Sequence, residues 1–441
     1  MRLPESVLSC IQTLNGAGFE AYAVGGCVRD ALLGLTPHDY DLCTNATPEE
    51  ICRLFSGYTL VRAGEKHGTI GVVIDHAVYE ITTFRTEGGY RDSRHPDWVR
   101  FVSDVTEDLA RRDFTVNAMA YAPATGLVDP WGGQADLENR VLRAVGDPAT
   151  RFTEDALRIL RGVRFAVRFD LTPEPATLQA MEALAQTMDK LARERVFEEL
   201  CKLLTVVKAE DLLQFAPVLV WVLPEVSASV GFLQHNPHHI YDVFTHTAHV
   251  VEAVAPTLPL RWAALLHDAG KPESFFLDEN GRGHFHGHAR ISARLAEQAL
   301  LRLKAPTALR ERVVLLIEQH MTQLLPDRKL LRRRLNQHGE ETVRQMLELQ
   351  KADFNSKGTG TPREAAIFDQ IEALLDEILA ENACLSLRDL AVDGKDLLAM
   401  GAPAGKQLGA CLSYLLEQVL DEQLPNESDA LLAAARQYLR L

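Results

Sequence analysis

The stretch AYAVGGCVRDALLGLTPHDYDLCTNAT, Ala21 to Thr47, places a glycine pair, a short helix-forming run and two aspartates within one segment. Its apolar start predicts a strand that turns at Gly25 and Gly26, and the following residues predict a short helix. A second predicted strand then carries Asp39 and Asp41. Because side chains two residues apart in a strand share a face, we expect both carboxylates on one side, about 7 Å apart.

Carboxylates spaced in this way are typical ligands for Mg²⁺, which prefers oxygen. Glu80, in the strand-like stretch VYEITTF (Val78–Phe84), adds a third acid on a neighbouring strand. The glycine pair lets the backbone approach phosphate oxygens, and Arg29 can make forked contacts to them. A glycine turn or an aspartate pair alone is common on surfaces, so the prediction depends on their ordered combination. We predict a site for a nucleoside triphosphate and Mg²⁺, with Asp39, Asp41 and Glu80 as catalytic acids.

The composition is that of a globular protein with ample core, since 46% of its 441 residues are hydrophobic. The net charge of −15 does not favour nucleic acid or an anionic membrane as a partner, although a local basic stripe can still bind RNA. The seven cysteines form no CxxC pair, which indicates a reducing compartment. No apolar run approaches the ~18 residues of a membrane span, so we expect a cytoplasmic protein without a membrane partner.

The pattern of the chain changes near residue 145. Short strands and helices mix before it, and apolar residues recur at helical spacing almost throughout the remainder. We therefore expect an α+β fold, with a mixed-sheet head that includes FTVNAMAY (Phe114–Tyr121) and VLRAV (Val141–Val145), followed by a long all-α body. The predicted parts are the head at 1–145, a helical neck at 146–215, a histidine-rich helical domain at 216–355 and a helical tail at 356–441.

Four segments match one family in the same order. They are GGCVRDALLG with HDYDL, RRDFTVNAM (Arg111–Met119), DPWGGQADL (Asp129–Leu137) and EDALRILRGVRF (Glu154–Phe165). Together they resemble the class II tRNA nucleotidyltransferases and bacterial poly(A) polymerases, over the head and neck and more weakly to the end of the chain. The roles that the resemblance implies are phosphate contact by Gly26 and Arg29, metal binding by Asp39 and Asp41, triphosphate contact by Arg112, and ordering of the sugar-side pocket by Asp113 and Asn117.

The segment after the head carries a polar stripe at helical spacing, made of Asp155, Arg158, Arg161 and Arg164. Cytosine and adenine each present an amine beside an unprotonated ring nitrogen, whereas uracil and guanine present a carbonyl beside a ring N–H. A carboxylate only accepts hydrogen bonds and a guanidinium only donates them. Asp155 and Arg158 would therefore accept C and A and leave U and G mismatched. Arg161 and Arg164 would serve the phosphates or brace the aspartate, and a solvated basic helix face is the alternative.

Two further stretches bear on the nucleotide site. The polar, glycine-broken segment Phe84–Phe101 resembles the flexible loop that the family uses in switching from C to A addition, and a plain surface loop is the alternative. The amphipathic stretch Glu194–Leu204 contains Arg195 and Glu199, which resemble a family signature and which we predict to be structural.

The middle of the chain spaces histidines and aspartates in the order H…HD…H…H…D, which resembles an HD-type phosphohydrolase domain. The matching positions are His246, His267, Asp268, His288, His320 and Asp353. An adjacent His–Asp pair can ligate one divalent metal, such as Ni, Mn, Mg or Fe, which would activate water for phosphoester hydrolysis. The resemblance leaves open whether the domain hydrolyses a substrate or serves as a scaffold.

Taken with the resemblance, the motifs imply an enzyme that adds CCA to the 3′ end of tRNA from CTP and ATP with Mg²⁺ and releases pyrophosphate. Three alternatives remain at this point: a poly(A) polymerase or a C-only or A-only relative, an HD phosphohydrolase with an inactive head, and a non-enzymatic tRNA-binding protein. The basic run PDRKLLRRRL (Pro326–Leu335) is a candidate contact for an RNA backbone. The sequence leaves the oligomeric state open.

Overall fold

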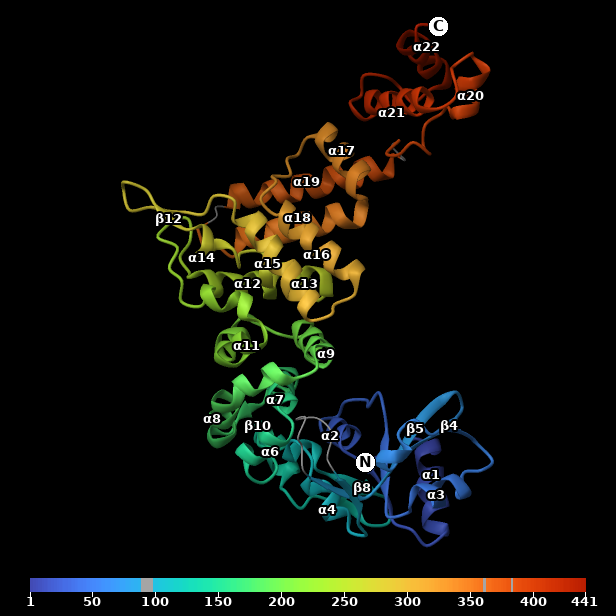
Figure 1. Cartoon of the computed structure of the whole chain (residues 1–441), viewed down its shortest axis with the longest axis vertical. Coiled ribbons are helices and arrows are strands. Elements are labelled where there is room, and N and C mark those ends of the chain that lie inside the picture. Colours follow the sequence, from blue (N-terminus) through green and yellow to red (C-terminus); the bar gives the residue numbers. More distant parts are fainter. Residues whose placement is uncertain (89–97, 360–361, 382–383) are drawn as a thin grey trace. The chain divides into compact units, whose positions relative to one another are not determined.

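The computed structural model describes residues 1–88, 98–359, 362–381 and 384–441 (Figure 1). The chain forms two compact units, one of residues 1–207 and 214–224, the other of residues 208–213 and 225–441. The first unit contains a mixed sheet with helices and the second is almost entirely helical, which confirms the α+β expectation. The four predicted parts and the three boundaries between them stay predictions.

The first unit is built on a seven-stranded sheet with the order β3-β4-β5-β2-β1-β8-β9. Strands β2 and β5 pair in parallel and the remaining neighbours pair antiparallel, so the predicted mixed sheet is confirmed. The strand bounds are β1 Ala21–Val24, β2 Asp41–Thr44, β3 Thr59–Val61, β4 Thr69–Ile74, β5 Ala77–Thr83, β8 Ala120–Ala122 and β9 Gly126–Val128.

The register of β2 and β5 decides which acids meet. Leu42 pairs with Ile81, and both side chains are fully buried in the core. Because side chains alternate along a strand, Asp41 and Glu80, one position earlier in each strand, emerge next to each other on the opposite face. Adjacent strands lie about 4.8 Å apart, so the two carboxylates are near neighbours.

Asp39 is not part of a strand, contrary to the prediction. Strand β1 ends at Val24, which pairs with Asp41, and the chain then turns at Gly25 into the next helix. The pairing of β1 with β2 ends at Asp41, so Asp39 lies exposed in the loop before β2.

Two other predicted strands are corrected. Residues 115–117 of the FTVNAMAY segment form a 3-10 turn, and only its last part joins the sheet as β8. In the VLRAV segment, β10 (Val141–Leu142) pairs in parallel with β11 (Thr172–Pro173) in a separate ribbon instead of the main sheet.

Helices flank the sheet and continue into the neck (Figure 1). Their bounds are α1 Glu5–Gly16, α2 Gly26–Leu32, α3 Pro48–Leu54, α4 Val105–Ala110, α5 Gly133–Glu138, α6 Pro148–Glu154, α7 Leu157–Phe169, α8 Pro175–Leu184, α9 Arg193–Leu204 and α11 Ala216–Val222.

The predicted base-reading helix is interrupted at Asp155. Helix α6 begins after Asp147, whose carboxylate accepts the N–H of Thr150, and it ends before Asp155. Asp155 is extended, with φ −141° and ψ 104°, and its carboxylate accepts the N–H of Leu157 at 3.0 Å. An aspartate favours this position because its side chain competes for free N–H groups at a helix start.

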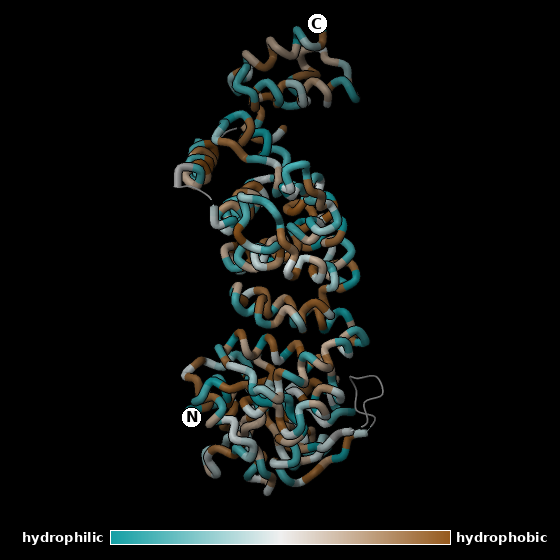
Figure 2. Tube along the Cα trace, turned by 90° about the vertical axis from the view of Figure 1, so that its left-hand side faces the viewer, coloured by the Kyte–Doolittle hydropathy of each residue, from teal (hydrophilic) through white to brown (hydrophobic). Residues whose placement is uncertain are grey.

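The second unit consists of packed helices with two short strands. Figure 2 shows apolar and polar residues alternating along the helical turns, as expected for helices with one buried face. The bounds are α12 Val243–Ala253, α13 Leu258–Leu266, α14 Lys271–Ser274, β12 Phe276–Leu277, β13 Gly283–His284, α15 His288–Arg302, α16 Thr307–Gln319, α17 Arg328–His338, α18 Glu340–Asn355, α19 Pro362–Ala380, α20 Gly394–Ala399, α21 Lys406–Leu420 and α22 Ser428–Leu439, and α10 Ala209–Gln214 lies at the unit boundary. Among the described residues, none of the helices combines the length and apolar character needed to cross a membrane.

Candidate active site

A cleft of about 410 Å³ in the first unit collects most of the residues that the head and neck motifs singled out. Among the described residues, its lining contains six arginines and three aspartates, an excess of positive charge in a chain whose net charge is −15. Such a cleft suits a polyanion. The lining residues are Gly25, Gly26, Arg29, Asp41, Arg111, Arg112, Asp113, Asn117, Asp155, Arg158, Arg161, Phe165 and Arg195.

The glycine turn and Arg112 form one wall of the cleft. Gly25 has φ +76°, a conformation that side chains with a Cβ rarely adopt. A Cβ at this position would also lie 2.7 Å from Nη1 of Arg112. The turn therefore needs glycine for two reasons, its backbone conformation and the close approach of the guanidinium.

The acids meet at this end of the cleft. Loss of water around the Asp41 carboxyl raises its pKa, Arg112 acts against that rise, and the negative charges of Glu80 and Asp39 raise the pKa further. Asp41 lines the cleft, and the side chains of Asp41, Glu80 and Asp39 are all exposed. Three neighbouring carboxylates that present only oxygen are a suitable ligand set for Mg²⁺.

A hydrogen-bond network of four residues lines the cleft. Arg29 donates to the Asn117 side-chain oxygen at 2.5 Å, and Asn117 donates to Asp113 at 3.0 Å. Arg161 closes the network with two bonds to Asp113, at 2.9 and 2.7 Å. Burial alone would raise the pKa of Asp113, but Arg161 and the Asn117 hydrogen bond lower it to about 2. The Arg29 guanidinium also lies 4.1 Å above the Phe169 ring, so the network is held rigidly.

Asp155 and Arg158 also line the cleft, and each is held in place by other residues. Arg158 donates to Glu154 at 2.5 Å and to the backbone oxygens of Arg151 and Arg111 at 3.0 and 3.1 Å. Asp155 accepts a bond of 2.9 Å from Nη2 of Arg195. The predicted pair is thus brought into one cleft with both side chains fixed.

Arg195 lines the cleft, whereas the sequence predicted a chiefly structural role for it. Its Nη2 holds Asp155, while its Nη1 is buried without a hydrogen-bond partner among the described residues. The sequence places Arg195 and Glu199 on one amphipathic helix, α9. This pattern predicts the helix, but it does not predict that the Arg195 side chain reaches Asp155, 40 positions earlier in the chain.

Arg164 does not reach the cleft. Its guanidinium bonds Glu199 of α9 at 2.5 Å, and both side chains are only 7% exposed. The segment Phe84–Phe101 is described in part: β6 (Arg85–Gly88) pairs antiparallel with β7 (Trp98–Phe101). Residues 89–97 of the predicted flexible loop lie outside the described residues.

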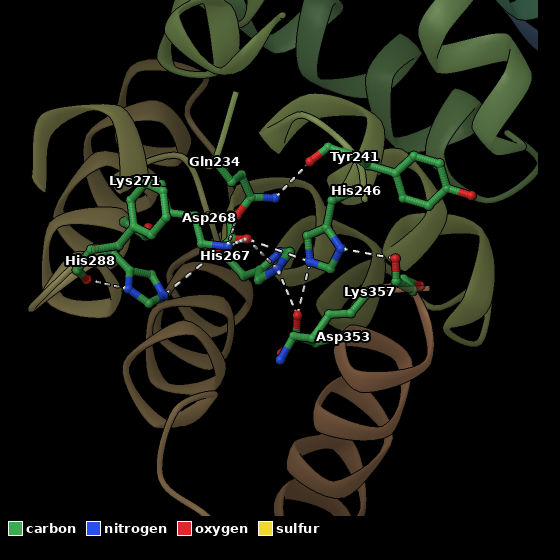
Figure 3. A network of polar contacts seen from close by, with 12 residues as sticks. Gln234, Tyr241, His246, His267, Asp268, Lys271, His288, Asp353 and Lys357 are labelled. Carbon is green, nitrogen blue, oxygen red and sulfur yellow. Dashed lines mark hydrogen bonds and ion pairs between the residues drawn. The ribbon is translucent and has the colours of Figure 1, made fainter. Parts of the chain in front are cut away.

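The six HD-motif residues converge in the second unit, and Figure 3 labels five of them, His246, His267, Asp268, His288 and Asp353. Nε2 of His246 lies 2.9 Å from Asp353 and 3.6 Å from Asp268, and Nε2 of His267 lies 3.3 Å from Asp268. On the other side of Asp268, Nε2 of His288 lies 3.4 Å from Oδ1. His320 completes the cluster.

The ligand atoms form two groups that share one carboxylate: His246, His267 and Asp268, and Asp268, His288 and His320. His288 and His320 face each other, with 3.2 Å between their Nε2 atoms. Burial lowers the pKa of His320 to about 4, so its imidazole is neutral at physiological pH. Neutral imidazoles and carboxylates are the ligands that a divalent transition metal prefers.

The cluster includes two lysines that sequence reasoning missed. Nζ of Lys271 lies 2.7 Å from Oδ2 of Asp268, and Nζ of Lys357 lies 3.0 Å from Oδ2 of Asp353. Burial would raise the pKa of Asp268, but His267 and Lys271 bring it well below its usual value. Lys271 follows the His–Asp pair by three residues, a spacing that could have suggested it.

The basic run of α17 is largely neutralised within the second unit. Arg328 pairs with Glu381 and Glu422, Arg332 also reaches Glu422, and Arg333 pairs with Asp421. Much of its charge therefore stabilises contacts between helices and is not available to a phosphate backbone. Contact with RNA at Pro326–Leu335 stays a prediction.

Three family models match the chain. The Poly A polymerase head domain matches residues 21–143, the probable RNA and SrmB-binding site of polymerase A matches residues 170–228, and the putative tRNA nucleotidyltransferase domain 2 matches residues 285–435.

Similar proteins span nearly the whole chain. The CCA-adding enzyme of Levilactobacillus brevis is 37% identical over 435 residues, which cover 96% of this chain and 95% of that protein. The CCA-adding enzyme of Limosilactobacillus fermentum is 34% identical over 436 residues, which cover 98% and 96%. The solved structure of the Bacillus stearothermophilus CCA-adding enzyme in complex with CTP is 27% identical, covers 100% of this chain and 98% of that one, and gives a TM-score of 0.75.

Proposed function

The chain belongs to the family of CCA-adding enzymes, and from this membership we propose that the cleft of its first unit adds C, C and A to the 3′ end of tRNA from CTP and ATP. The observation that carries the assignment to this cleft is that one lining joins two kinds of group. Asp41, a carboxylate for metal, lies beside the glycine turn, and the same cleft contains Asp155 and Arg158, a pair suited to C and A. Relatives that span the whole chain are CCA-adding enzymes, which favours the complete CCA sequence over a poly(A) tail or a single nucleotide.

In this proposal the triphosphate lies between the Gly25–Gly26 turn and Arg112, whose charge stabilises the phosphate oxygens. The tRNA 3′-hydroxyl loses its proton to solvent and attacks the α-phosphate, the bond to the β-phosphate breaks, and pyrophosphate leaves. Asp39, Asp41 and Glu80 would hold Mg²⁺, which would supply neutralisation of the negative charge in this transfer.

The sugar side of the nucleotide lies against the buried Asp113 network. Hydrogen bonds already join Arg29 to Asn117, and both Asn117 and Arg161 to Asp113. The network therefore acts mainly as a rigid support that has little need to rearrange when the nucleotide binds. A pre-organised site of this kind retains more of its binding energy. Arg164 supports the neck through Glu199 and has no direct role in this proposal.

Base choice belongs to Asp155 and Arg158. Each Asp155 oxygen already accepts one bond, from Leu157 or Arg195, and keeps lone-pair capacity for the amine of C or A. A uracil or guanine carbonyl facing this carboxylate would leave two acceptors opposed, which costs about 1–3 kcal/mol in a desolvated site. We propose a cytoplasmic location, in keeping with seven cysteines that are all free.

The test is nucleotide incorporation on tRNA that lacks its 3′ CCA. With CTP alone we expect two additions, with CTP and ATP three, and with Asp41→Ala almost none. Growth beyond three nucleotides in ATP would instead support a poly(A) polymerase. If the Asp41→Ala variant still added nucleotides, the reaction would not take place in this cleft.

We propose a second site in the HD cluster, a divalent-metal centre that acts on a phosphoester. The convergence of all six motif residues, which span more than a hundred positions of sequence, favours it over a chance spacing. His246, His267, Asp268 and Asp353 would hold one ion, with Asp268 open to a second beside His288 and His320. The metal would supply an activated water for hydrolysis.

Purified protein with Mn²⁺ should release phosphate from a simple ester such as phenyl phosphate, and Asp268→Ala should lose that release while keeping CCA addition. Equal release by the variant and the parent would show that the cluster serves only as a scaffold.

A further inference from the structure

An exposed apolar surface adjoins the catalytic acids on the sheet of the first unit. Strands β4 and β5 lie side by side there (Figure 1), and Val73 pairs with Val78 across them. Val78 is 54% exposed, and Val61 on the neighbouring strand β3 is 43% exposed. Because side chains alternate along a strand and paired residues share a face, these three valines lie on the face that carries Glu80. We call Val61, Val73 and Val78 the valine surface.

Gly71 makes the valine surface continuous. It pairs with Val61 on one side and with Glu80 on the other. A Cβ at Gly71 would lie 2.9 Å from Cγ1 of Val78 and 3.1 Å from Cβ of Val61, so these two valines cover the glycine and bury it. The valines therefore form one connected apolar area, which differs from the single apolar residues that are scattered over most protein surfaces.

The valine surface begins close to the acids. Val78 lies two residues along β5 from Glu80, which is about 7 Å, and Val61 lies two strands away from Glu80, which is about 10 Å. The register of β2 and β5 makes Glu80 and Asp41 neighbours. A metal held by these carboxylates would therefore stand at the border of the valine surface.

The geometry of the transfer decides what lies on each side of Asp41. On its β1 side, Asp41 pairs with Val24, which leads into the turn at Gly25 and Gly26 where the triphosphate is proposed to lie. On its β5 side lie Glu80 and the valine surface. In an in-line displacement, the attacking oxygen and the leaving pyrophosphate stand on opposite sides of the phosphorus. With pyrophosphate on the glycine side, the attacking hydroxyl approaches from the β5 side.

We propose that the valine surface binds the terminal nucleoside of the tRNA, whose 3′-hydroxyl is the nucleophile. This inference rests on the proposed CCA addition. Valine side chains have no hydrogen-bonding group, so they pack against the flat face of any base without selecting among bases. The reaction requires this tolerance, because the terminal base changes between additions, from the base that precedes CCA to C. Selection of the incoming nucleotide belongs to Asp155 and Arg158, which line the cleft.

Cross-linking tests the location directly. A tRNA that lacks CCA and ends in 4-thiouridine is bound to the full chain with Mg²⁺ and irradiated, and the linked peptide is identified by mass spectrometry. We expect the link within residues 59–61 or 71–80. A link confined to other segments, or no link although the protein extends the same tRNA, would overturn the inference.

Val61→Ser combined with Val78→Ser removes the exposed apolar side chains and leaves Glu80 in place. We expect the KM for tRNA lacking CCA to rise about tenfold and the KM for CTP to change less than about twofold. The rise should be equal for tRNAs that end in A or in C, because the surface does not select a base. Val206→Ser is the matched control, since Val206 is 42% exposed in the same unit and lies outside the sheet. A melting curve for each variant checks that it is folded.

The outcomes separate the two ideas. Nucleotide addition with an unchanged KM for tRNA in the double variant would overturn the inference and leave CCA addition standing. A parent protein that extends no tRNA would overturn the proposed function and the inference with it. If the double variant changed its oligomeric state in light scattering while its KM for tRNA stayed the same, the surface would belong to a second copy of the chain, and the inference would be wrong.

Discussion

Glu199→Leu should destabilise the first unit strongly without changing nucleotide selection. The change removes the carboxylate that bonds Arg164 at 2.5 Å, in a place where both side chains are 7% exposed. A guanidinium left buried without its partner costs about 3–5 kcal/mol. For a domain of about 200 residues, each kcal/mol lowers the Tm by about 2–4 °C, so we expect a fall of roughly 6–20 °C.

Calorimetry and urea unfolding of the full chain measure this loss, with Glu198→Leu as the control because Glu198 is the exposed neighbour on the same helix. The double change Arg164→Met with Glu199→Leu should restore much of the stability, since an apolar pair of similar volume avoids the unpaired charge. The KM for CTP should stay unchanged in the double variant. A raised KM with little loss of stability would refute the reasoning and place Arg164 at the nucleotide.

The remaining predictions concern the cleft. Asp155→Ala should raise misincorporation of U about tenfold or more relative to C, because the opposed acceptor is gone, and unchanged selectivity in single-nucleotide assays would contradict the role of Asp155. Arg195→Ala should lower kcat/KM for both CTP and ATP about tenfold by releasing Asp155, with Arg195→Lys recovering part of it, whereas Lys202→Ala on the exposed side of α9 should have no effect. Arg161 and Asn117 lower the pKa of Asp113 to about 2. The ionised Asp113 therefore adds about 2 kcal/mol to the free energy of unfolding above pH 4, and this stabilisation is lost as the pH falls through 2. In urea unfolding, the difference in free energy of unfolding between the parent and Arg161→Met should become smaller from pH 4 to pH 2.

Local patterns were sufficient for the framework of the head. The apolar start of Ala21–Thr47 and the stretch Val78–Phe84 correctly predicted the strands β1 and β5. They also placed Glu80 on the strand next to that of Asp41, because the register follows from which face is buried. The limit appeared at Asp39, whose place depends on where the neighbouring strand ends and not on its own sequence.

The spacing of residues along one helix could not predict ion pairs between side chains that are distant in sequence. Arg164 belongs to the same three-residue repeat as Arg158, yet the repeat drifts around the helix and brings Arg164 to Glu199 on α9. Arg195 reaches Asp155 only because α7 and α9 pack together. Such pairings depend on tertiary packing, which a repeat along one helix does not encode.

The HD cluster shows the same division. The ordered series of histidines and aspartates was enough to bring its six members together, because metal ligands must be spaced through several helices in a fixed order. The lysines beside its two carboxylates carry no such signal. Lys357 lies in the segment after α18, where an exposed lysine is the ordinary expectation.

The most direct measurement is a structure of the protein with CTP bound. The account predicts that the triphosphate lies between the Gly25–Gly26 turn and Arg112, and that the cytosine amine donates to the Asp155 carboxylate within about 3.2 Å. A nucleotide found outside this cleft, or one whose base points away from Asp155, would contradict it.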